Sequence, residues 1–178
     1  MKRVFVAAFV LTCLASVGLM TPVLADDHQA AMIEEALSAA PPDLGKGATV
    51  TDWEGNVLKA GDNGWTCMPS PPQLEGSAPM CLDAAWMEWA DAYANKKEYA
   101  GGKFGMSYML RGDGGASNID PYAEGPTDDN QWVQEGPHLM ILVPDPALLE
   151  SMSTDPSNGG PYVMWKGTSL VHIMVPLD

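Results

Sequence analysis

Two short apolar runs near the C-terminus constrain the fold of this chain more than any other feature. They read "PHLMILVP" (137–144) and "LVHIMVP" (170–176), and both close on Val-Pro. Neither approaches the ~20 apolar residues that a membrane-spanning helix needs. Short runs of this kind, bounded by turn residues, are typical of buried β-strands. The sequence therefore predicts a sheet with central strands at 138–144 and 170–176.

A helix earlier in the chain sets the expected fold class. Segment 83–99 begins at Asp83, a favourable N-cap residue, and is followed by a Gly101-Gly102 stop. An aromatic stripe with helical spacing is formed by Trp86, Trp89, Ala90 and Tyr93. We expect the stripe to cover one face of a sheet; a platform on which a ligand stacks is the alternative.

Two further segments, 103–111 and 162–166, also have strand character. The segment 113–136 between strands is rich in Gly, Asp, Asn and Pro and is expected to be a long loop. This order of elements predicts one α+β domain, with a mainly antiparallel sheet covered on one face by the Trp-rich helix.

The N-terminal segment has the pattern of a signal peptide. Lys2 and Arg3 precede an apolar run from Val4 to Met20, and Val23-Leu24-Ala25 fits the requirements of signal peptidase. We therefore expect a signal peptide at 1–25, a short helix and linker at 26–47 and the α+β domain at 48–178. The mature protein is expected to be exported to the periplasm or the extracellular medium.

The charge of the mature chain excludes several classes of partner. Loss of Lys2 and Arg3 leaves 7 basic residues against 23 acidic ones, a net charge of −16. Nucleic acids and anionic membrane surfaces both require a basic footprint. The sequence therefore predicts an acidic protein that binds no nucleic acid and does not insert into a membrane after signal cleavage.

Cys67 and Cys81 are the two cysteines of the expected mature chain. In an oxidising compartment such a pair usually forms a disulfide. The segment between them contains four prolines and has no periodic pattern, so it is expected to be a loop that the bond holds in place. We predict a structural disulfide between Cys67 and Cys81.

Each of the two apolar runs carries a His-x-Met motif. Residues two apart on a strand share a face, so His138 points with Met140 and His172 with Met174. If the two strands are neighbours and these faces coincide, the four side chains form a soft ligand set that favours Cu(I). The His-x-Met spacing is similar to that of several periplasmic copper-binding proteins. The register of the strands, which decides whether the faces coincide, is left open by the sequence.

Three functions remain compatible with these residues. The first is an exported binding domain for a small molecule or a metal ion, with copper as the candidate cofactor. Its metal ligands would be His138, Met140, His172 and Met174, and Tyr108 and Arg111 could join the histidines around a small molecule. The second is a small exported enzyme that uses His138 or His172 as a general acid or base. The third is a structural or envelope-interaction domain with both histidines in its core.

Overall fold

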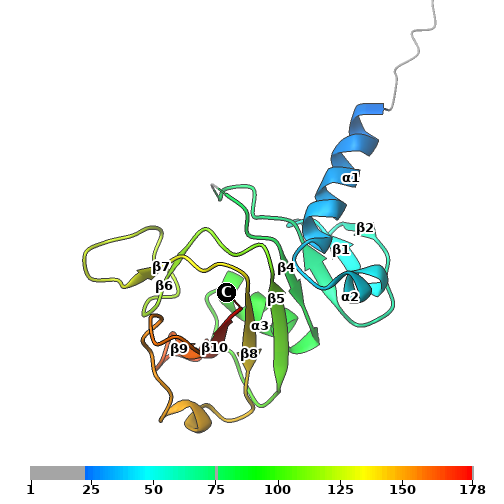
Figure 1. The fold of residues 1–178 in the computed structure, drawn as a ribbon. Coiled ribbons are helices and arrows are strands. Elements are labelled where there is room, and N and C mark those ends of the chain that lie inside the picture. The colour runs from blue at the N-terminus through cyan, green and yellow to red at the C-terminus, as the bar shows by residue number, and fades with distance from the viewer. Residues whose placement is uncertain (1–22, 75, 178) are drawn as a thin grey trace, which may run out of the picture.

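The computed structural model of the protein describes residues 23–74 and 76–177 (Figure 1). Residues 1–22 of the predicted signal peptide (1–25) lie outside the described residues. The helices are α1 (Val23–Leu37), α2 (Pro42–Gly47), α3 (Ala84–Ala94) and a 3-10 turn at Pro146–Leu149. The strands are β1 (Thr49–Thr51), β2 (Val57–Lys59), β3 (Thr66–Met68), β4 (Met80–Leu82), β5 (Gly105–Met109), β6 (Ala116–Ser117), β7 (Trp132–Val133), β8 (His138–Leu142), β9 (Tyr162–Met164) and β10 (His172–Pro176).

Eight of the described strands form one sheet in the order β2-β1-β3-β4-β5-β8-β10-β9. All neighbours pair antiparallel except β1 and β3, which are parallel. The fold is therefore α+β with a mostly antiparallel sheet, as predicted. The four predicted central strands are all present and are two to four residues shorter than expected, because their ends leave the ladder.

The parallel pairing of β1 with β3 follows from the path of the chain between them. The chain forms a hairpin from β1 to β2 and then crosses back over residues 47–49, so that β3 lies on the other side of β1. Gly61 permits this crossing, because a Cβ atom there would lie 2.2 Å from the carbonyl carbon of Ala48. Backbone contact this close requires glycine.

Helix α3 packs on one face of the sheet, as predicted from its tryptophans. The Asp83 side chain accepts a hydrogen bond from the Trp86 amide and a second from the Met106 amide on β5. Trp86 and Trp89 are buried, whereas Tyr93 is 37% exposed. The helix ends at Ala94, five residues earlier than expected, where Lys96 takes a left-handed conformation (φ 51°).

Helix α1 packs near β1–β4 and projects away from the sheet at its N-terminal end (Figure 1). Its Glu35 carboxylate accepts hydrogen bonds from the amide and the hydroxyl of Ser70. The linker expected after this helix contains a second short helix, α2. Within the described residues, no helix is both long and apolar enough to cross a membrane.

The predicted disulfide between Cys67 and Cys81 is present. Both cysteines are fully buried and lie directly opposite each other on β3 and β4. Strand β4 was not expected, since it is only three residues long and follows a proline-rich loop.

Candidate metal centre

Strands β8 and β10 are antiparallel neighbours, and their His-x-Met motifs lie on the same face of the sheet. Met140 is directly opposite Met174 in the ladder. His138 is opposite Pro176 at one end of the pair. His172 lies next to the pair Ile173–Ile141, at the other end. The two histidines are thus four ladder positions apart, roughly 13 Å along the strand direction, with the two methionines between them.

The same face of the sheet carries further methionines. Met109 on β5 is directly opposite His138, and Ser107 is opposite Met140. Met164 on β9 is opposite His172. The residues that define this methionine face are Met68, Met80, Met109, Met140, Met164 and Met174. Met106 is on the other face, because it alternates with Ser107 along β5.

The His138 ring is fully buried and holds a single tautomer. Its Nδ1 lies 2.8 Å from the carbonyl oxygen of Gly136. Since a carbonyl can only accept, Nδ1 carries a hydrogen, and Nε2 is the nitrogen that carries the lone pair in the neutral ring. That Nε2 has no hydrogen-bond partner among the described residues, and neither has the buried hydroxyl of Ser107. A buried polar atom without a partner costs free energy and requires an explanation.

His172 occupies a different environment, although its motif is the same. Its Nδ1 lies 3.0 Å from the Leu170 carbonyl oxygen, so it too presents Nε2 as the unprotonated nitrogen. Three tryptophans meet the ring edge-on, Trp86, Trp89 and Trp165, with ring centroids 5.1–5.5 Å away. Burial lowers the pKa of His172 to about 4, although the bond to Leu170 opposes the shift. The ring is therefore neutral at pH 7.

A hydrogen bond crosses the methionine face above β10. Tyr162 on β9 lies opposite Met174, and its hydroxyl donates to Glu135 Oε1 at 2.7 Å. Glu135 comes just before β8, so the bond spans β10 on the methionine side. The backbone amide of Glu135 in turn donates a hydrogen bond to Asp113 Oδ1. Burial raises the pKa of Tyr162, and the bond to Glu135 adds to the rise, so the tyrosine stays a hydrogen-bond donor.

The predicted loop 113–136 is more ordered than expected. It contains the β6–β7 ladder, and Ser117 donates a hydrogen bond to the Asn130 carbonyl. These contacts are made by polar residues and backbone, which leave no periodic apolar pattern in the sequence.

The small-molecule site expected from the sequence is not gathered in one place. Tyr108 pairs with Leu139 and therefore lies on the face opposite the methionines, packed against Trp65. Arg111 is exposed beyond the end of β5. His138 and His172 are the only two of these four side chains that share a face.

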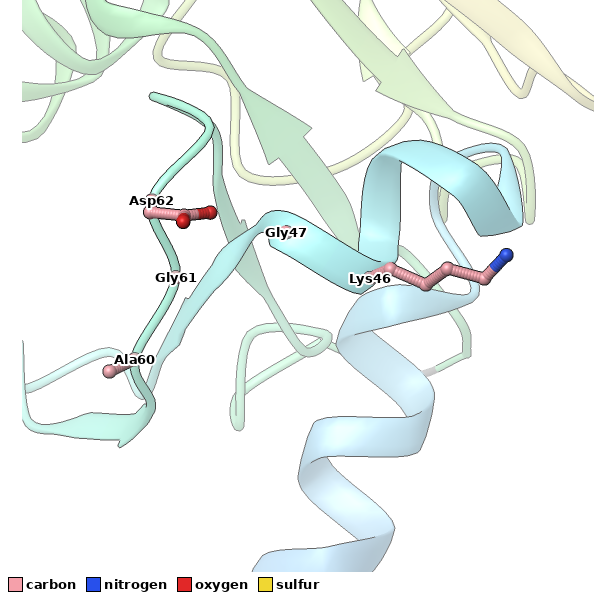
Figure 2. A pocket seen from close by; sticks show the side chains of 5 residues that line it. All are labelled: Lys46, Gly47, Ala60, Gly61 and Asp62. Carbon is pink, nitrogen blue, oxygen red and sulfur yellow. The ribbon is translucent and has the colours of Figure 1, made fainter.

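Surface hollows lie elsewhere in the molecule. One of about 330 Å³ is lined by Lys46, Gly47 and the segment 60–62; Figure 2 shows the Lys46 side chain pointing away from Asp62. A groove of about 870 Å³ runs between α1 and α2. In the described part of the chain, no group of three or more His, Cys, Asp or Glu side chains is placed to hold a metal ion.

The pairing of β5 with β8 brings in Met109, which sequence reasoning did not include in the candidate site. Met109 lies within the predicted strand 103–111, but its position opposite His138 depends on strand order and register. Comparison with known proteins gives no further guide: no family model, curated protein or solved structure matches this chain.

Proposed function

We propose that the mature protein is an exported binding domain for Cu(I), held at the His138 end of the methionine face. The observation that carries the proposal is His138 Nε2, which is buried, has no partner among the described residues and lies on the sheet face that carries Met109 and Met140. Imidazole and thioether ligands together select Cu(I) over harder cations.

The ligand set favoured by the register is His138, Met109, Met140 and Met174. Side chains directly opposite on antiparallel strands have Cβ atoms about 4.5–5.5 Å apart, which places Met109 within reach of the same ion as His138. Met140 shares the face two residues on, and Met174 is its cross-strand partner. His172 is the least favoured member of the set expected from sequence, because it lies at the far end of the ladder among tryptophans.

The surroundings of His138 fit a metal ligand. Histidines that bind metals usually donate their other ring N–H to a carbonyl or carboxylate, which fixes the tautomer, and His138 does so to Gly136. The methionine face supplies thioether sulfurs, which Cu(I) prefers to the oxygen ligands of harder ions. The charge of −16 on the mature chain raises the local concentration of cations.

The test is competition for Cu(I) against a chromogenic chelator, with ascorbate keeping the copper reduced. Met109→Leu and Met140→Leu remove one sulfur each at nearly constant side-chain volume. We expect each to weaken Cu(I) binding about tenfold or more, and His138→Ala to abolish it. Met106→Leu is the matched control, because Met106 is on the same strand as Met109 but faces the other way. Equal affinity in Met109→Leu, Met140→Leu and Met106→Leu would overturn the proposal.

A further inference from the structure

Four aromatic rings with nearly parallel planes lie together and reach from the core to the surface: three are mutually in contact, and the fourth contacts one of them. Trp89 and Trp165 stack at 5.5 Å between ring centroids, and Tyr93 lies 5.5–5.6 Å from both. Tyr122, from the loop 113–136, stacks on Tyr93 at 5.6 Å. The planes of successive rings differ by 14° or less. We call these four residues the aromatic column; Tyr93 and Tyr122, at its outer end, are 37% and 38% exposed.

The column is held in place by contacts that a simple core would not need. Trp165 has a left-handed backbone (φ 58°), which is costly for a bulky residue. Its amide donates to the Asn118 carbonyl and its indole N–H to the Ser117 carbonyl, so the loop that carries Tyr122 also fixes Trp165. The two tyrosines are therefore presented on a rigid base rather than on a freely moving loop.

The segment that carries Tyr122 is acidic. Residues 112–165 contain nine Asp and Glu and neither Lys nor Arg. Asp120 lies close enough to Tyr93 to contribute, after burial and Tyr122, to a raised pKa of that tyrosine. The chain itself places a cation on this surface: the Lys96 ammonium lies 5.2 Å from the centroid of the Tyr122 ring.

We propose that the outer end of the aromatic column docks a cationic segment of a partner protein, with an arginine stacked on the Tyr122 ring. Charge complementarity selects the sign of the partner, and exposed tyrosines on a rigid base are typical of interface hot spots. A guanidinium is favoured over an ammonium because it is planar, stacks on aromatic rings and is more weakly hydrated. The partner's arginine would take the position that Lys96 occupies in the free protein.

The test uses a hexa-arginine peptide as the probe, with isothermal titration of the full mature chain at physiological ionic strength. Tyr122→Ala should weaken binding by about 3- to 30-fold, whereas Tyr122→Phe, which keeps the ring, should bind as the wild type does. Trp53→Ala is the control for loss of an exposed aromatic side chain. Trp53 is also 38% exposed but follows β1, near the opposite edge of the sheet.

A second pair of variants separates ring stacking from net charge. Lys96→Ala and Lys97→Ala each remove one positive charge from the same turn, but only Lys96 lies over Tyr122. We expect Lys96→Ala to tighten hexa-arginine binding more than Lys97→Ala does, because it also vacates the ring. Equal affinity of Tyr122→Ala and wild type would show an attraction by charge alone. Equal affinity for hexa-lysine, or displacement of the peptide by a neutral oligosaccharide, would equally overturn the proposal. None of these outcomes depends on copper binding.

Discussion

Replacing His138 by leucine tests whether this histidine stabilises the metal-free fold or serves to bind Cu(I). The unpartnered Nε2 of His138 costs about 1–3 kcal/mol in the folded protein, and the Nδ1 bond to Gly136 returns about 1 kcal/mol. Leucine removes both contributions and suits the apolar methionine face. We therefore expect metal-free His138→Leu to be as stable as the wild type, or more stable by up to about 2 kcal/mol.

The same substitution at His172 should have the opposite effect. His172 makes three edge-on contacts with tryptophan rings, each worth about 0.5–1.5 kcal/mol, and a hydrogen bond to Leu170. Even after the gain from burying leucine, we expect His172→Leu to lose about 2 kcal/mol or more. The two variants thus provide matched controls for each other.

The assay is equilibrium unfolding in urea, followed by tryptophan fluorescence, with and without Cu(I). An ion present at 100 times its dissociation constant stabilises the protein that binds it by about 2.7 kcal/mol. Added Cu(I) should therefore raise the unfolding midpoint of the wild type and leave that of His138→Leu unchanged. If metal-free His138→Leu were as unstable as His172→Leu, His138 would be a packing residue and the reasoning would be wrong.

Three further effects should be measurable on the metal-free protein. Removal of the disulfide by Cys67→Ala/Cys81→Ala should cost about 3 kcal/mol by the loop-closure argument, lowering the melting temperature by roughly 6–12 °C in a thermal scan; an unchanged melting temperature would show that β3 and β4 pair independently of it. His172 is neutral and buried when folded, so the unfolded chain takes up a proton more readily below pH 6.5. Stability should therefore fall by up to about 3 kcal/mol between pH 6.5 and pH 4, a slope that His172→Leu should flatten if this histidine is its source. Asp83→Ala removes both the α3 cap at Trp86 and a bond to β5. It should cost about 2–3 kcal/mol in urea unfolding, and Asp83→Asn, which keeps the cap acceptor, should lose less.

Much of the sheet could be predicted because its central strands are mostly apolar. Segments such as 138–144 and 170–176 can bury both faces only as strands inside a domain, and the Trp-rich stripe of α3 needs an apolar face to cover. The disulfide followed from the presence of only two cysteines in the expected mature chain. These features depend on local composition and spacing, which a single sequence displays.

The features that were missed depend on pairing between distant segments. β4 has three residues, and β6 and β7 have two each, so none carries a recognisable period. Their positions are fixed by backbone partners and, for β6, by polar contacts such as the Ser117–Asn130 bond. The neighbour of His138 on β5 could not be known without strand order, which is why Met109 was absent from the expected ligand set.

The two His-x-Met motifs show why a repeated motif need not have a repeated role. Because β8 and β10 run antiparallel, the first residue of each motif lies at the opposite end of the shared ladder. Helix α3 covers the end of the ladder that carries His172, and Trp86 and Trp89 of this helix pack edge-on against the imidazole. The end that carries His138 lies beside thioethers that leave its Nε2 unpartnered. The same His-x-Met motif therefore places one imidazole against tryptophan rings and the other opposite Met109 with its Nε2 unpartnered, so we expect the two histidines to respond differently to substitution and to Cu(I).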